Sequence, residues 1–238
     1  MRERLLVNTT KHEDNCVRRV RIFSGLTTQQ QDIVATMARP ESLGDGELVH
    51  GPGQRTGKMF VVHSGQIKVS RVLPSGRKQL LRVVRPGETL GEHAFLTGEP
   101  TLEEAEALEE TRLCVFVHED LAELIQRYPA IANRMLGTLG ERLAQTEHQL
   151  TLNAQSLEVR IADYLLQQPL LRDNASAATL RVRLPLNKKD IASLLGTTPE
   201  SFSRGLARLQ RKNLLGIADD IVTLRDPAGL EALVVVDA

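Results

Sequence analysis

A short segment near the C-terminus carries the residues whose chemistry is easiest to interpret. In TTPESFSRGLARLQR, Phe202, Leu206 and Leu209 recur at spacings of four and three residues, which is typical of the buried face of a helix. The opposite face then carries five polar residues: Glu200, Ser203, Arg204, Arg208 and Arg211. An Arg can bridge O6 and N7 of guanine, a Glu can accept from the cytosine amino group, and a Ser contacts several bases. The segment therefore predicts a helix that enters the major groove of DNA.

A partner helix is expected directly before this segment, at about residues 187–195. Ala192 supplies a small side chain where two helices would cross, and Gly196 lies where the chain must turn. Pro199 suits the first turn of the second helix. Lys188 and Lys189 are expected to contact phosphates, and Thr198 is expected to cap the second helix. The predicted DNA-contacting residues are Lys188, Lys189, Thr197, Thr198, Glu200, Ser203, Arg204 and Arg208. The alternative is an ordinary helical hairpin with a solvated charged face.

The charge distribution favours the first interpretation. Lys plus Arg equal Asp plus Glu over the 238 residues, so the formal net charge is zero. Between residues 160 and 215, however, ten basic residues face four acidic ones, a local excess of six positive charges. Such a segment is suited to DNA phosphates.

The last third of the chain, 158–238, contains the elements that would hold the helix pair. A helix is expected at 160–171, a polar loop at 170–181, a strand at 180–186 and a hairpin at 218–226. A helix pair flanked by small strands in this order predicts a winged helix-turn-helix.

Residues 129–157 show a different period. Apolar and small residues alternate at spacings of four and three, at Ala132, Leu136, Leu139, Leu143, Thr146, Leu150, Asn153 and Leu157. This heptad stripe predicts a long helix that pairs with a second copy, with Leu136, Leu139, Leu143, Leu150 and Asn153 in the seam. The alternative is a helix that packs only on its own chain.

Residues 1–128 are expected to form a β-roll domain behind a short N-terminal segment. From 42 to 117, β-rich stretches are broken by turn signals at 44–47, 51–53, 64–65, 74–76 and 86–88. Before them, SGLTTQQQDIVATMA predicts a helix capped by Thr27. The expected fold class is therefore α+β: a jelly-roll-like β-roll, a dimerisation helix and a winged helix-turn-helix.

Several classes of function are disfavoured. We expect a cytoplasmic protein, because no apolar run is long enough to span a bilayer and the N-terminus lacks the apolar core of a secretory signal. The chain has no G-x-S-x-G, P-loop, HExxH or Rossmann fingerprint, so an enzyme is not expected. We expect no metal site, since the two cysteines lie too far apart for a local CxxC motif.

Together these features resemble the CRP/FNR family of bacterial transcription regulators. The resemblance rests on PGETLGE at 86–92, SGQIKV at 64–69 and DIASLLGTTPESFSR at 190–204, where Glu200, Ser203 and Arg204 match the ExxSR order of the FNR branch. It implies a homodimer that reads a TTGAT-like palindrome in double-stranded DNA and contacts RNA polymerase.

The resemblance also limits the signal that is sensed. Relatives that bind cyclic AMP hold its phosphate with an Arg-Ser pair, but this chain has Leu102 and Glu103 there, and a carboxylate repels phosphate. Relatives with a [4Fe–4S] cluster use four cysteines, whereas this chain has two, so no cofactor is expected. Haem remains an alternative, with His50, His63, His93 and His118 in or near the roll.

The two cysteines are similar in position to those of FLP-type regulators. This resemblance implies a reversible dithiol/disulfide switch between Cys16 and Cys114. Arg18, Arg19 and Arg21 are cations that favour a thiolate at Cys16. The alternative is that Cys114, in the apolar stretch LCVF, is a small buried hydrophobe.

Overall fold

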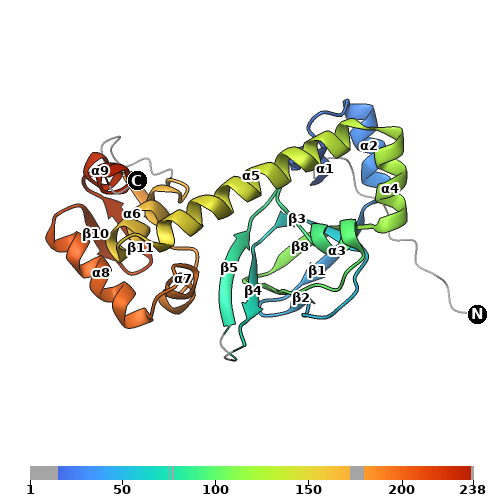
Figure 1. Cartoon of the computed structure of the whole chain (residues 1–238). Helices are drawn as coiled ribbons and strands as arrows, with labels where there is room; N and C mark the ends of the chain where they lie inside the picture. Colours follow the sequence, from blue (N-terminus) through green and yellow to red (C-terminus); the bar gives the residue numbers. More distant parts are fainter. Residues whose placement is uncertain (1–15, 75, 77, 172–179, 237–238) are drawn as a thin grey trace, which may run out of the picture. The chain divides into compact units, whose positions relative to one another are not determined.

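The computed structural model describes residues 16–74, 76, 78–171 and 180–236. Its contacts divide the chain into two units (Figure 1). The first comprises the chain up to Val69 together with Val83–Gly140, and the second comprises Ser70–Arg82 and the chain from Glu141 on. The predicted α+β class is confirmed, and each unit is described by itself below.

Two antiparallel sheets form the predicted β-roll. Their strands are β1 (Arg39–Leu43), β2 (Leu48–His50), β3 (Lys58–Ser64), β4 (Ile67–Val72), β5 (Lys78–Val84), β6 (Thr89–Leu90), β7 (Glu104–Ala107) and β8 (Thr111–Val117). One sheet has the order β1-β8-β3-β6 and the other β2-β7-β4-β5. Apolar side chains from both, including Phe60, Val69 and Leu113, form a common buried core.

The turn signals fall where the sequence placed them. Gly46, Gly53, Gly65, Gly76 and Gly87 all have positive φ angles, a conformation that favours glycine. Gly65 is the most constrained of them, because a Cβ there would lie 2.3 Å from Oγ1 of Thr111. The tight turns thus fix the register of the roll.

Helices form a second core against the outer side of β3 and β8. They are α1 (Cys16–Arg19), the 3-10 turn η1 (Arg21–Phe23), α2 (Thr28–Met37), α4 (His118–Arg127) and the first part of α5 (Ala130–Asn153). Figure 1 shows α2 and α4 beside the start of α5. Thr27 caps α2 as predicted, since its hydroxyl accepts from the N–H of Gln30 at 3.3 Å. Helix α4 and the short α3 (Glu92–Thr97) were not predicted.

The long helix α5 is shorter than its heptad stripe suggested. It ends at Asn153, and Leu157 is instead the first residue of α6 (Leu157–Leu166). The reason is local: Ser156 is extended and its hydroxyl caps the next helix by accepting from the N–H of Val159. Ile131 and Met135 are buried, whereas Leu136, Leu143 and Leu150 are 66, 60 and 66% exposed.

The part of the second unit that follows α5 is a winged helix-turn-helix. After α6 come β9 (Leu180–Arg183), α7 (Lys188–Leu194), α8 (Pro199–Arg211), β10 (Leu215–Ala218), β11 (Ile221–Leu224) and α9 (Pro227–Val236). The strands form a sheet of order β10-β11-β9. Fully buried side chains such as Ile161, Phe202 and Leu230 lie on α6, α8 and α9. Helix α9 was not predicted. Among the helices of the described residues, none is long and apolar enough to cross a membrane.

Candidate nucleic-acid interface

The turn between α7 and α8 is built from the residues that the sequence singled out. Gly196 adopts a left-handed conformation with φ of 62°, and the N–H of Thr197 donates to the carbonyl of Ala192 at 2.8 Å. Thr198 caps α8 by accepting from the N–H of Ser201 at 3.2 Å, and Pro199 is the first residue of α8. Ala192 is fully buried. The local chemistry of the turn was therefore predicted from the sequence.

Helix α8 divides into a buried and an exposed face. Phe202, Leu206 and Leu209 are buried, as their spacing predicted. The outer face carries Glu200, Ser203, Arg204 and Arg211, which are all exposed. Of the other predicted contact residues, Lys188, Lys189 and Thr198 are exposed and Thr197 is half-buried. The structure thus places the matched ExxSR residues together on one accessible surface.

The start of α8 favours an ionised carboxylate. The backbone N–H of Glu200 itself lowers the pKa of the Glu200 carboxyl, and so do the Thr198 hydroxyl and the positive charge of Arg204. Arg204 donates to the Ser201 hydroxyl at 3.2 Å, a contact within α8. An ionised Glu accepts hydrogen bonds only, while the adjacent Arg donates only, so the pair presents both functions that base edges require.

Arg208 departs from the expected outward orientation. Its Nε atom lies 2.5 Å from Oε1 of Glu158, and Nζ of Lys212 lies 2.6 Å from Oε2 of the same carboxylate. Arg208 is therefore half-buried and paired within its own unit. Sequence analysis missed Glu158, because this contact spans fifty positions along the chain and leaves no local pattern.

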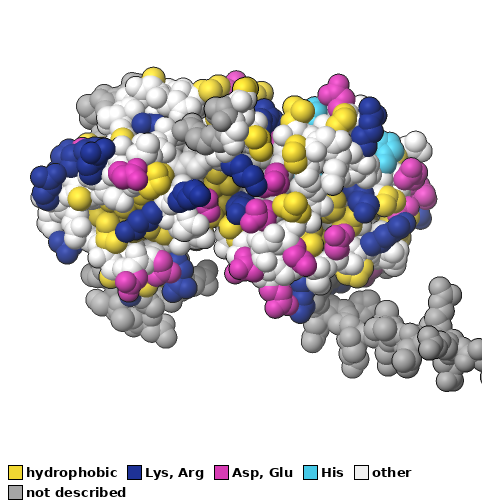
Figure 2. Space-filling model, turned by 90° about the horizontal axis from the view of Figure 1, so that it is seen from below, with side chains coloured by type: hydrophobic (Ala, Val, Ile, Leu, Met, Phe, Trp, Pro, Cys, Tyr) yellow, Lys and Arg dark blue, Asp and Glu magenta, His cyan; other side chains and the backbone are white. Residues whose placement is uncertain are grey.

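Basic side chains are exposed over several elements of the second unit. Figure 2 shows Lys and Arg in dark blue gathered at its left end, the side on which Figure 1 has α8 and β10. Arg183, at the end of β9, pairs at 3.3 Å with Asp220, which lies between β10 and β11. Arg172, which contributed to the local charge excess, lies outside the described residues. Exposed basic residues of the helix-turn-helix are thus Lys188 and Lys189 on α7, and Arg204 and Arg211 on α8.

Cys114 lies inside the core of the first unit. It is in β8 opposite Val61, and it belongs to the cluster that contains Val17, Val20 and the α5 residue Met135. It is disulfide-bonded, and the described residues contain no free cysteine. Cys16 begins α1, but its side chain lies outside the described part of the chain.

The arginines near Cys16 are partly engaged. Arg18 pairs with Asp32 at 3.1 Å, so one of the three cations expected to favour a thiolate is shared with a carboxylate. The side chain of Arg19 lies outside the described residues.

Leu102 and Glu103, the residues expected to disfavour a nucleotide phosphate, lie in the first unit. Leu102 is exposed and Glu103 is half-buried. Glu92 is buried and accepts a hydrogen bond from the Thr89 hydroxyl. Thr89 and Glu92 line a small pocket together with Ile22, Met59, Met135, Thr138 and Leu139.

The histidines considered for haem differ in burial: His50 is buried, His63 is half-buried, and His93 and His118 have the contacts given below. His50 is buried, and this burial lowers its pKa. His93 lies 3.5 Å from Glu99, and His118 contacts the ring of Phe95. Among the described residues, no group of three or more His, Cys, Asp or Glu side chains is arranged to hold a metal ion.

Comparisons with known proteins cover both units. Residues 40–128 match the cyclic nucleotide-binding domain family, and residues 159–233 match the Crp-like helix-turn-helix domain family. The nitrogen fixation regulation protein FixK of Rhizobium meliloti (strain 1021) is 30% identical over 189 residues, 79% of this chain and 83% of that protein. The probable transcriptional regulator flp of Lacticaseibacillus casei is 28% identical over 202 residues, 84% of this chain and 90% of that protein. A mutant of CooA from Carboxydothermus hydrogenoformans has the same fold, with a TM-score of 0.73 and 19% identity over 85% of this chain and 90% of that one.

Proposed function

Because the chain belongs to the CRP/FNR family of DNA-binding transcription regulators, we propose that it acts as a homodimer on a TTGAT-like palindrome. In this proposal a Cys16/Cys114 dithiol/disulfide switch controls binding, and the bound dimer contacts RNA polymerase. The observation that carries the proposal is the outer face of α8, where Glu200, Ser203 and Arg204 are exposed together.

Base reading by α8 follows from the chemistry of this face. Arg204 offers the paired donors that O6 and N7 of guanine accept, and ionised Glu200 accepts from a cytosine amino group. Lys188 and Lys189, at the start of α7, supply phosphate contacts that hold the helix in register. The buried face of α8 is apolar, so the polar face is the one left for DNA.

Dimer formation along α5 is supported by an exposed leucine stripe. Leu136, Leu143 and Leu150 recur every seven residues and are each at least 60% exposed. A seven-residue repeat of leucine on one helix is the pattern that pairs two helices side by side. Leu139 and Asn153 complete the proposed seam, with Asn153 as the polar residue that fixes its register.

Two findings support the switch. Cys114 is disulfide-bonded, and its core contains Val17 and Val20, which follow Cys16, the one other cysteine of the sequence, closely along the chain. Formation of an S–S bond from two thiols releases two protons and two electrons, which a peroxide or a disulfide oxidant accepts. No iron–sulfur cluster is part of this proposal, since two cysteines are fewer than the four that a cluster uses.

The test is a DNA-binding titration by fluorescence anisotropy on a TTGAT-type palindrome, with fully reduced and mildly oxidised protein. Intact mass reports the thiol state, and Cys16→Ser is the matched variant. We expect an affinity change that accompanies a mass decrease of two hydrogen atoms and that is absent in Cys16→Ser. Equal affinity in both states would refute the switch but leave DNA binding intact.

Control by a small ligand in the roll is the second candidate, because residues 40–128 match the cyclic nucleotide-binding domain family. Its ligand would not be cyclic AMP, since this chain has Leu102 and Glu103 in place of the Arg-Ser pair, and a carboxylate repels a phosphate. Isothermal titration with cyclic AMP should show no binding. A haem protein would instead be identified by its Soret absorption band.

A further inference from the structure

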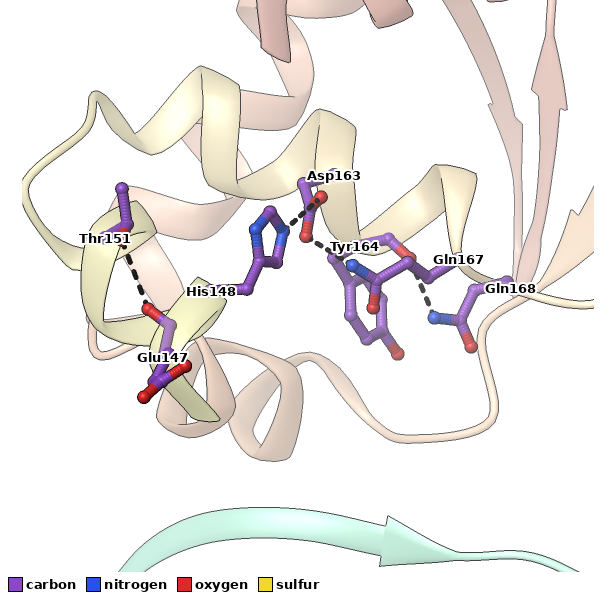
Figure 3. A network of polar contacts seen from close by, with 7 residues as sticks. All are labelled: Glu147, His148, Thr151, Asp163, Tyr164, Gln167 and Gln168. Atoms are coloured by element: carbon purple, nitrogen blue, oxygen red, sulfur yellow. Dashed lines mark hydrogen bonds and ion pairs between the residues drawn. The ribbon is translucent and has the colours of Figure 1, made fainter. Parts of the chain in front are cut away.

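Helix α6 makes polar contacts with its neighbours on two sides. Asp163 uses both of its carboxylate oxygens: Nε2 of His148 in α5 lies 3.0 Å from Oδ1, and Nε2 of Gln167 donates to Oδ2 at 2.7 Å (Figure 3). The Asp163 side chain is 15% exposed and that of His148 is 47% exposed. The C-terminal part of α5 is therefore tied to α6 through one largely enclosed carboxylate.

The first turn of α6 forms ion pairs with the C-terminal end of α8. The Glu158 carboxylate receives Nε of Arg208 at 2.5 Å and Nζ of Lys212 at 2.6 Å. Lys212 directly follows the last residue of α8, so this carboxylate holds the C-terminal turn of α8. The Glu158 side chain is 18% exposed, and the contact with Lys212 lowers its pKa.

Close packing and one further hydrogen bond complete the arrangement. Gly205 of α8 faces Ile161 of α6 so closely that a Cβ at Gly205 would lie 2.6 Å from Cδ1 of Ile161. Nη1 of Arg160 donates at 2.6 Å to the carbonyl of Leu195, at the end of α7. Helix α6 thus contacts both helices of the DNA-binding motif.

The connection between α5 and α6 is short. Only residues 154–156 separate Asn153 from Leu157. Such a linker permits many angles between two helices unless side chains fix one of them. The His148–Asp163 contact connects α5 with α6, and the Glu158 pairs connect α6 with the end of α8.

We infer that Asp163 and Glu158 are positioning residues that set the distance between the two recognition helices of the dimer. The inference rests on the proposed function, in which two copies pair along α5 and each α8 reads one half-site. In such a dimer the separation of the recognition helices depends on how each α8 is held relative to its own α5. The half-site spacing of the operator is then a geometric property of these contacts.

The experiment measures spacing preference rather than affinity alone. Anisotropy titrations use palindromes whose TTGAT-type half-sites are separated by the preferred distance or by one or two base pairs more or fewer, and a probe with a single half-site. The variants are His148→Ala, Asp163→Ala and Glu158→Gln. The matched controls are Glu147→Ala, an exposed neighbour of His148, and Glu231→Gln, an exposed carboxylate on α9.

We expect wild type and both controls to prefer one spacing. In the three variants the ratio of affinities between the preferred and the shifted palindromes should fall by about three- to tenfold, the scale of one lost hydrogen bond or ion pair. Affinity for the single half-site should change less than this ratio, because α8 itself is unaltered. Loss of general stability would instead weaken binding to all probes alike.

Two results would overturn the inference in different ways. An unchanged spacing ratio in His148→Ala and Glu158→Gln, with wild-type circular dichroism, would show that these residues do not position α8. Binding by a monomer, seen by sedimentation of the wild-type complex, would instead refute the proposed dimeric function and with it the inference. His148→Ala keeps the test decisive if Asp163→Ala fails to fold, since His148 is exposed on α5.

Discussion

Arg204 and Arg208 lie four residues apart on α8, yet the structure predicts different effects when each is replaced by Ala. Arg204→Ala should lower DNA affinity, whereas Arg208→Ala should lower the stability of the domain. Arg204 is exposed, and its Nη2 donates to the neutral Ser201 hydroxyl. In the proposed complex, Arg204→Ala removes one bidentate contact to a guanine, so the affinity should fall by about 1–3 kcal/mol, or roughly five- to 150-fold. Its effect on folding should stay within about 0.5 kcal/mol, as for most surface substitutions.

Arg208→Ala should instead act on the domain itself. The substitution removes one of the two cations on Glu158 but leaves Lys212 at 2.6 Å from that carboxylate. Because Arg208 is partly exposed, the lost pair is worth about 0.2–1 kcal/mol of unfolding free energy. Discrimination between the correct operator and one with a changed base pair should remain.

The assay compares each variant on the intact operator and on a set of operators with one base pair changed in each half-site. Thermal unfolding gives the stability change, and Arg211→Ala is the control for removal of an exposed Arg from the same helix. Wild-type affinity of Arg204→Ala for the intact operator would refute the assignment of the recognition face. Loss of base discrimination in Arg208→Ala would refute the argument that Glu158 withdraws this side chain from DNA.

Three further predictions concern separate parts of the molecule. Lys189→Ala should weaken binding to all sequences alike and reduce the slope of log affinity against log salt by about 0.9, measured by anisotropy at several salt concentrations; an unchanged slope would exclude a phosphate contact. Leu143→Glu should raise the dimer dissociation constant by roughly a hundredfold or more in sedimentation equilibrium, because each copy loses a leucine whose burial is worth about 1.5–3 kcal/mol; a stable dimer would rule out the α5 seam. Burial lowers the pKa of His50 below its usual 6.5, so the folded protein binds fewer protons than the unfolded chain, and the contribution of neutral His50 to stability is complete above about pH 6.5 and decreases as the pH falls below it. Thermal unfolding of His50→Leu should therefore depend less on pH than that of wild type between pH 6.5 and 5, and equal pH profiles would contradict this assignment.

Local sequence patterns predicted the turns of the roll and the helix-turn-helix. Glycine in turn signals predicted the corners of the roll, because positive φ angles depend on the residue itself. The Thr198 cap, Pro199 and Gly196 predicted the helix-turn-helix for the same reason. The apolar spacing of Phe202, Leu206 and Leu209 then determined which face of α8 is exposed.

The features that sequence analysis missed depend on tertiary contacts. Helical periodicity places Arg208 on the outward side of α8. The pairing of Arg208 with Glu158, fifty positions away in the sequence, leaves no local pattern. His148 and Asp163 likewise lie on different helices with no motif between them. The helix predicted at 129–157 was too long because Leu157 continues the heptad spacing. The spacing alone does not show that the chain is interrupted after Asn153 and that Ser156 caps a new helix.

The role of α5 connects the proposed switch with the proposed recognition surface. Cys114 shares its core with Ile131 and Met135, so a change at its sulfur alters the packing of residues that hold the start of α5. Within the other unit, the end of α5 is tied through His148 and Asp163 to α6, and through Glu158 to α8. Coupling between distant sites requires an element that both sites bias. Helix α5 is the candidate for this element, because the cysteine core contacts its start, and its end is connected through α6 to the recognition helix. A redox-dependent spacing preference on the shifted palindromes, abolished by His148→Ala but retained in Glu147→Ala, would therefore identify α5 as that element, whereas a redox response that survives His148→Ala would require another route.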